Sequence, residues 1–123
     1  MNKDIVAFIG LGNMGLPMAI NIAKAGINVS AYDINPAATA KLEGISITVA
    51  HSVEQCVRNS NLVITMLPDG SAVLNVLSEI LDSLESPTTL IDCSTIDVED
   101  ARKAHKLCKE AGHSFLDAPV SGG

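Results

Sequence analysis

Short apolar runs alternate with helical patterns along the whole chain. Each run is bounded by glycine, proline or polar residues and has the length of a strand. Continuous apolar runs of this length are typical of parallel strands that are covered on both faces. The pattern predicts six strands, over Ile5–Ile9, Val29–Tyr32, Ile45–Val49, Leu62–Leu67, Thr89–Asp92 and Ser114–Ala118.

The segments between these runs carry helix signals. Asn35 and Pro36 have the order of an N-cap and a first helical residue, and Ser52 with Gln55 has the spacing of a capping box. Residues 97–111 have an acidic first turn and a basic end, as the helix dipole favours. The predicted helices cover residues 14–25, 36–43, 52–58, a stripe from Val73 to Leu84, and 97–111, where Val98, Ala101, Ala104 and Cys108 share one face.

Strand–helix alternation of this kind predicts an α/β fold. The expected architecture is a doubly wound parallel sheet of the Rossmann type, with about six strands and helices on both faces. A length of 123 residues fits one domain, residues 1–123. The apolar fraction is 47% and the aromatic fraction only 2%, so the core must consist of aliphatic side chains.

Charge and cysteine content narrow the possible partners. The net charge of −6 argues against nucleic acid or an anionic membrane as a partner. The three cysteines, Cys56, Cys93 and Cys108, have no metal-ligand spacing and indicate a reducing compartment. We therefore expect a cytoplasmic protein, or a mitochondrial matrix protein in a eukaryote, with no metal site. No apolar run has the length of a membrane span.

The stretch GLGNMG lies between the first predicted strand and the first helix, and contains Gly10, Gly12 and Gly15. In this context the first glycine permits a tight turn and the second allows a pyrophosphate to approach the backbone. The third lets the helix pack closely on the strand, and the helix start attracts phosphate. The motif predicts a dinucleotide site, although ordinary turn glycines would have the same spacing.

Asp33 supplies the acidic residue expected about twenty positions after such a motif, at the end of the second strand. A carboxylate there accepts hydrogen bonds from the adenosine ribose and repels a 2′-phosphate. The next cation after it is Lys41. Asp33 therefore favours NAD over NADP, unless it is only a solvated strand end.

Ligands of open α/β sheets bind beyond the carboxyl ends of the strands. Leu67 and Pro68 offer an apolar surface for an adenine or ribose, and Ser94 and Thr95 offer hydroxyl groups near the expected nicotinamide. Thr95 has an equal alternative as the cap of the next helix. The hydroxyl and successive amides of Ser121, Gly122 and Gly123 are suited to a carboxylate.

Four segments together resemble the β-hydroxyacid dehydrogenase family: FIGLGNMGLPMAINIAKAG, ITMLP, LIDCSTID and FLDAPVSGG. The resemblance implies oxidation of a β-hydroxy acid to its semialdehyde, with hydride transfer to NAD. It assigns the cofactor to residues 10–15 (Gly10, Leu11, Gly12, Asn13, Met14 and Gly15), Asp33, Leu67, Pro68 and Thr95. It assigns the substrate carboxylate to Ser121, Gly122 and Gly123. Ala72 departs from the family pattern, in which an Asn often occupies this position.

The same resemblance implies an all-helical domain beyond residue 123 that carries the catalytic lysine. We therefore expect no catalytic residue within residues 1–123, and a chain that binds NAD without turnover and self-associates through its uncovered surface. Two alternatives remain: an NADPH-dependent semialdehyde or glyoxylate reductase of the same family, and a non-catalytic dinucleotide-binding module.

Overall fold

The computed structural model describes residues 4–120, which form a six-stranded parallel sheet. The strand order is β3-β2-β1-β4-β5-β6. The strands are β1 (Ile5–Ile9), β2 (Asn28–Tyr32), β3 (Thr48–Val49), β4 (Leu62–Thr65), β5 (Thr89–Asp92) and β6 (Ser114–Asp117). The helices are α1 (Gly15–Lys24), α2 (Pro36–Ala40), α3 (Val53–Val57), α4 (Gly70–Ser83) and α5 (Val98–Glu110).

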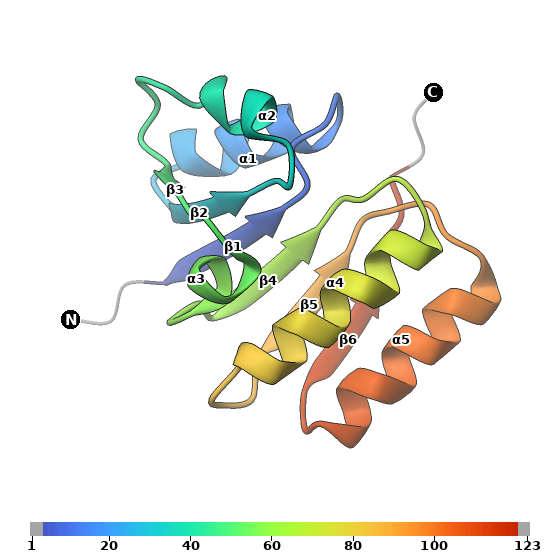
Figure 1. Ribbon diagram of the computed structural model, residues 1–123. Helices are drawn as coiled ribbons and strands as arrows, with labels where there is room; N and C mark the ends of the chain where they lie inside the picture. Colours follow the sequence, from blue (N-terminus) through green and yellow to red (C-terminus); the bar gives the residue numbers. More distant parts are fainter. Residues whose placement is uncertain (1–3, 121–123) are drawn as a thin grey trace.

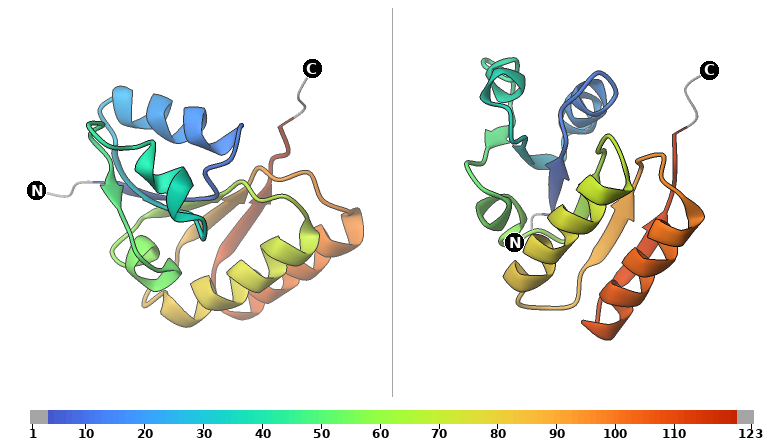
Figure 2. Two further views of the ribbon diagram at one scale, coloured as in Figure 1. Left: turned by 45° about the horizontal axis from the view of Figure 1, so that its top comes forward. Right: turned by 45° about the vertical axis from the view of Figure 1, so that its right-hand side comes forward.

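The helices lie on both faces of the sheet (Figures 1 and 2). Helices α3, α4 and α5 cover one face, where Val57, Leu77 and Cys108 pack on Val63 and Leu90. Helix α1 and the α2 region cover the other face, where Ala19 and Leu42 pack on β1 and β2. The predicted doubly wound Rossmann fold is confirmed.

The order in which successive strands are added to the sheet reverses between β1 and β4, which is the topological switch point of the fold. These two strands are neighbours, with Ile9 paired to Thr65, although β2 and β3 lie between them in the sequence. The connections after β1 and β4 therefore run to opposite sides and open a crevice at the carboxyl edge. This crevice is where such a fold binds a ligand.

Several elements differ from the sequence-based expectation. Helix α2 ends at Ala40 instead of residue 43, and β4 ends at Thr65 instead of Leu67. Strand β3 contains only Thr48 and Val49, because Ile45 and Ile47 lie in tight turns: the Ile45 amide donates to the Leu42 carbonyl and the Ile47 amide to the Ile45 carbonyl. Val98, expected on the buried face of α5, is 66% exposed and belongs to neither core cluster. It lies in the first turn of the helix, whereas Ala104 and Cys108 further along are buried.

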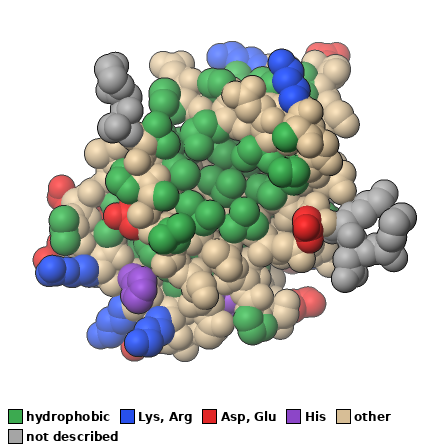
Figure 3. Space-filling model, turned by 180° about the vertical axis from the view of Figure 1, so that it is seen from behind, with side chains coloured by type: hydrophobic (Ala, Val, Ile, Leu, Met, Phe, Trp, Pro, Cys, Tyr) green, Lys and Arg blue, Asp and Glu red, His purple; other side chains and the backbone are tan. Residues whose placement is uncertain are grey.

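One half of the sheet is covered on a single face. The row Phe8, Ile64, Ile91 and Leu116 crosses the sheet on the α1 side, each residue paired to the next. Exposure rises along this row, from the fully buried Phe8 to Leu116, which is 56% exposed. Figure 3 shows the broad apolar area on this side of the molecule. No helix within residues 4–120 is long and apolar enough to cross a membrane.

Candidate functional site

The turn between β1 and α1 depends on two glycines that have no room for a side chain. Gly10 has a φ of +105°, and a Cβ there would overlap the Met66 carbonyl. A Cβ on Gly15 would overlap the Gly10 carbonyl and reach within 3.3 Å of Phe8. The two glycines thus let the turn, α1 and the end of β4 approach each other closely.

Gly12 has different surroundings from these two glycines. A Cβ added to it would meet nothing within 4 Å, so its backbone faces open space. The N-cap of α1 is Met14, which makes no side-chain hydrogen bond to the helix amides. By contrast, Asn35, Ser52 and Asp69 cap α2, α3 and α4 with their side chains. The start of α1 therefore presents uncapped amides and a partial positive charge to an anion.

The carboxylate of Asp33 holds the glycine-rich turn in place. Its Oδ2 accepts a 2.7 Å hydrogen bond from the Leu11 amide, and its Oδ1 accepts a 2.8 Å bond from the Asn35 amide. Each carboxylate oxygen has a further acceptor position, so both bonds are compatible with ribose hydroxyl groups as additional donors. Asp33 lies half-buried at the end of β2, beside the uncapped start of α1.

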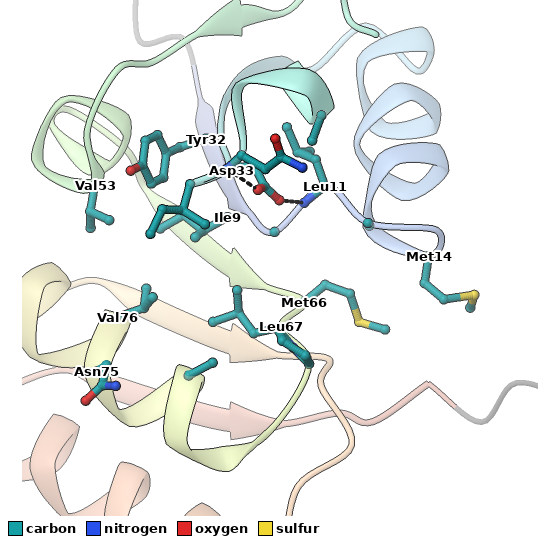
Figure 4. A pocket seen from close by; sticks show the side chains of 18 of the residues that line it. Ile9, Leu11, Met14, Tyr32, Asp33, Val53, Met66, Leu67, Asn75 and Val76 are labelled. Carbon is teal, nitrogen blue, oxygen red and sulfur yellow. Dashed lines mark hydrogen bonds between the residues drawn. The ribbon is translucent and has the colours of Figure 1, made fainter. Parts of the chain in front are cut away.

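A cavity of about 750 Å³ extends from this turn across the switch point. Figure 4 shows Tyr32 and Asp33 on one side of it and Leu67 and Val76 on the other. The size lies within the range of small-molecule sites, and the wall is mostly apolar with a few polar groups. Lining residues that the sequence analysis did not single out as site residues are Ile9, Tyr32, Ile34, Asn35, Ala38, Val53, Met66, Ala72, Asn75, Val76 and Glu79.

Part of this wall had a signal in the sequence. Ala72, Asn75, Val76 and Glu79 have the spacing i, i+3, i+4 and i+7, so they share one stripe of α4. All four line the cavity, so this stripe of α4 faces the crevice. The residues from β2 and α3 had no comparable signal, because their approach depends on tertiary packing.

Most of the expected cofactor residues meet at this cavity. Its lining includes residues 10–15, Asp33, Leu67 and Pro68. Thr95 is exposed and lies outside the lining, and it does not cap α5, whose N-cap is Asp97. Ser121, Gly122 and Gly123 fall outside the described residues.

Ser94 does not offer a free hydroxyl group to a nicotinamide. The residue is fully buried. Its Oγ donates a 2.6 Å hydrogen bond to Asp92 Oδ1 and accepts a 2.7 Å bond from the Leu67 amide. The expectation of a ligand-facing Ser94 was wrong, because the side chain turns into the protein to satisfy these two partners.

The three cysteines and His113 have structural surroundings, whereas His51 and His105 are exposed. Burial raises the pKa of the Cys56 and Cys108 thiols to about 11. Burial, together with the nearby carboxylates Asp92 and Asp117, also raises the pKa of Cys93. The His113 Nδ1 accepts a hydrogen bond from the Thr88 amide, which fixes a loop. No group of metal-binding side chains occurs within residues 4–120.

The strand order, the glycine-rich turn at the switch point and the acidic end of β2 define the class of dinucleotide-binding α/β domains. Residues 5–123 match the family model described as the NAD binding domain of 6-phosphogluconate dehydrogenase. The chain belongs to this family of NAD-binding domains, which includes those of the β-hydroxyacid dehydrogenases.

Individual relatives give more detail than the family model. The chain is 42% identical over 118 residues to a probable 3-hydroxyisobutyrate dehydrogenase of Mycobacterium tuberculosis, covering 96% of this chain and 40% of the relative. It is 43% identical over 121 residues to 3-hydroxyisobutyrate dehydrogenase of Pseudomonas aeruginosa, covering 96% and 41%. The structure of Mycobacterium tuberculosis 3-hydroxyisobutyrate dehydrogenase with L-serine superposes with a TM-score of 0.94 at 41% identity, covering 99% of this chain and 42% of that chain.

These matches confirm the resemblance to β-hydroxyacid dehydrogenases, and the likeness extends over nearly the whole chain. The chain spans about 40% of the length of the curated relatives it matches.

Proposed function

We propose that this chain is the cofactor-binding part of a 3-hydroxyisobutyrate dehydrogenase-like enzyme. The enzyme oxidises a β-hydroxy acid to its semialdehyde and transfers a hydride to NAD. The observation that carries the proposal is the uncapped start of α1 beside the open face of Gly12, with the Asp33 carboxylate in the same cavity.

The residues of the cavity fit the parts of a dinucleotide. The amides of residues 12–15 would bind the pyrophosphate, because the helix start supplies unpaired donors and no side chain occupies the approach. The Asp33 carboxylate would accept hydrogen bonds from the adenosine ribose. Leu67, Pro68 and Val76 would flank the adenine end with apolar surface. When bound, the nicotinamide ring supplies the hydride acceptor.

The preference for NAD over NADP rests on Asp33. Both of its oxygens already accept backbone amides, which holds the carboxylate in the cavity wall. A 2′-phosphate on the ribose would meet this negative charge, and the described lining of the cavity contains no Lys or Arg to compensate for it. NADPH should therefore bind more weakly than NADH.

Calorimetric titration of the chain with NADH and with NADPH tests this preference. The variant Asp33→Asn retains an oxygen that can accept from the Leu11 amide but removes the charge. We expect wild type to bind NADH more tightly than NADPH. Asp33→Asn should lower the ratio of the NADPH dissociation constant to the NADH dissociation constant about tenfold. An unchanged ratio would contradict the role of Asp33, and a wild-type preference for NADPH would favour the reductase alternative.

The 123-residue chain is expected to be inactive on its own. The general acid/base that the family resemblance implies, a lysine outside residues 1–123, typically contributes a factor of about 10²–10⁴. Ser121, Gly122 and Gly123 remain the proposed substrate-carboxylate site, and Thr95 remains a proposed contact of the cofactor at the carboxyl edge. Dehydrogenase activity of the purified chain on a β-hydroxy acid would overturn the expectation of inactivity.

A further inference from the structure

A series of hydrogen bonds between buried polar groups connects β5 to the wall of the cofactor cavity. Asp92 Oδ1 accepts hydrogen bonds from Thr65 Oγ1 at 2.8 Å, from Ser94 Oγ at 2.6 Å and from the Ser94 amide at 3.1 Å. The Ser94 hydroxyl in turn accepts a 2.7 Å bond from the Leu67 amide. Asp92 and Ser94 are fully buried, so water does not compete for these bonds.

The Leu67 end of this hydrogen-bond series lies directly behind the glycine-rich turn. Leu67 and its neighbours Met66 and Pro68 line the cavity. The Met66 amide donates to the Ile9 carbonyl, and a side chain on Gly10 would overlap the Met66 carbonyl. The β4–α4 loop and the glycine-rich turn therefore fit against each other, and a shift of Leu67 moves the wall that faces the dinucleotide.

The direction of the Ser94 hydroxyl is determined by its partners. The Leu67 amide can only donate, so the hydroxyl oxygen must accept from it. The hydroxyl hydrogen must then point to the carboxylate of Asp92, which also accepts from the Ser94 amide. Asp92 thereby fixes both the rotamer of Ser94 and the position of the Leu67 amide.

Burying Asp92 in this arrangement costs folding free energy. Asp92 is fully buried, and its Oδ2 has no hydrogen-bond partner among residues 4–120. Burial of a carboxylate destabilises a fold unless its bonds compensate, whereas apolar side chains fill such positions without that penalty. The residues paired with Asp92 across the sheet are Thr65 and Asp117, and Thr65 is one of the donors to Asp92 Oδ1. What Asp92 supplies in return is an acceptor oxygen for Thr65 and Ser94, and the bond to Ser94 leads on to the Leu67 amide of the β4–α4 loop.

We propose that Asp92 and Ser94 are positioning residues for the cofactor cavity. Asp92 orients the Ser94 hydroxyl, and Ser94 holds the Leu67 amide, so that the β4–α4 loop is fixed against the glycine-rich turn before the dinucleotide binds. Neither side chain touches the cofactor. The inference rests on the proposed binding of a nicotinamide dinucleotide in this cavity.

The test compares Ser94→Ala with Ser60→Ala in the 123-residue chain. Ser60 Oγ donates to the Val57 carbonyl at the opposite end of the sheet, so its loss also removes one side-chain bond but leaves the cavity intact. We expect Ser94→Ala to raise the dissociation constant of NADH about tenfold at a temperature where both variants are folded. Ser60→Ala should stay within about twofold of wild type.

Two further measurements separate positioning from general destabilisation. Asp92→Asn retains an acceptor oxygen and should keep the dissociation constant of NADH within about threefold of wild type. Amide hydrogen exchange of Leu67, measured without ligand, should accelerate in Ser94→Ala and not in Ser60→Ala. If Ser94→Ala does not fold, Ser94→Cys keeps a similar volume with a weaker acceptor and should show the same two effects.

An unchanged NADH affinity in folded Ser94→Ala, or equal losses in Ser94→Ala and Ser60→Ala, would overturn the positioning role. Wild-type protein that does not bind NADH would instead overturn the proposed function, and the positioning of a cofactor with it. The exchange measurement distinguishes these cases, because it reports on the Leu67 amide independently of NADH.

Discussion

The three glycines of the first turn have different tasks at the scale of single residues. Gly10 and Gly15 are structural, because a side chain on either would overlap a carbonyl group. Gly12 has open space around its Cα, so the fold itself does not require a glycine there. Under the proposed function the requirement at Gly12 comes from the ligand, since a methyl group would occupy the approach of the pyrophosphate.

Gly12→Ala should therefore separate binding from folding. We expect its free energy of unfolding to stay within about 0.5 kcal/mol of wild type, since nothing is displaced. Its dissociation constant for NADH should rise at least about tenfold. Gly15→Ala is the matched variant, and it should lower the melting temperature strongly because its Cβ would overlap the Gly10 carbonyl. Thermal unfolding and calorimetry measure both; NADH binding by Gly12→Ala at wild-type affinity would contradict the assignment.

We expect the buried thiol of Cys56 to make the protein less stable at alkaline pH. Burial raises its pKa from the ordinary value of 9.0 to about 11, and its Sγ lies 3.3 Å from the Ser30 carbonyl. Between about pH 9 and 11 the unfolded chain loses this proton while the native chain keeps it. Stability is therefore fully present below pH 9 and falls through that window, by up to about 1.4 kcal/mol per pH unit for each such thiol.

Urea unfolding of wild type and Cys56→Ala at pH 8, 9, 10 and 11 measures this effect. The variant should be less stable at pH 8 because it loses packing. It should also lose less stability than wild type as the pH rises, because it lacks one titrating thiol. Identical slopes for the two proteins would show that Cys56 does not contribute.

At the scale of helices and strands, most of the fold could be predicted from the sequence. Periodicity located every element, and the caps Asn35 and Ser52 were confirmed. Ile45 and Ile47 were misassigned to a strand because an apolar run does not reveal a tight turn. Ser94 was misassigned to the ligand because its partners Asp92 and Leu67 approach only through the pairing of β4 with β5.

The candidate site divides in the same way. Residues 10–15 and Asp33 carry a local motif whose spacing is visible in the sequence. Tyr32 and Val53 join the cavity wall only through packing between distant segments, and no local pattern indicated them.

The cap of α3 gives a prediction at this scale. Ser52 Oγ accepts a 3.0 Å hydrogen bond from the Gln55 amide, and Gln55 Oε1 accepts one from the His51 amide. Ser52→Ala should destabilise the protein by about 1 kcal/mol, or about 4 °C in melting temperature. Ser78→Ala, at an exposed position within α4, is the control and should change stability by less than about 0.5 kcal/mol. Equal effects of the two substitutions would contradict a role for the cap.

At the scale of the whole molecule, the coverage of the sheet is uneven. The row from Phe8 to Leu116 becomes more exposed with distance from α1 (Figure 3). The opposite face of the same strands is covered by α4 and α5 (Figure 1). Contiguous apolar areas on a surface mark sites of contact with another molecule. Apolar surface is buried when it packs against apolar surface, so a second copy of the chain can cover this face.

We therefore predict that the 123-residue chain self-associates in a concentration-dependent manner. Leu116→Lys places a charge in the most exposed position of the row and should shift the equilibrium toward monomer. Lys109→Ala on α5 is a control on the other face of the sheet and should leave it unchanged. Sedimentation velocity over a range of concentrations measures both; a wild-type chain that stays monomeric at high concentration would contradict the prediction.

We propose that a nicotinamide dinucleotide binds across the start of α1 and along the wall formed by the β4–α4 segment. Titration of the ¹⁵N-labelled chain with NADH, followed by amide chemical shifts, tests it most directly. We expect the largest shifts in residues 10–15 and 33–35, and in the cavity-lining residues between 66 and 79. An absence of shifts at millimolar NADH, or shifts confined to the opposite end of the sheet, would contradict it.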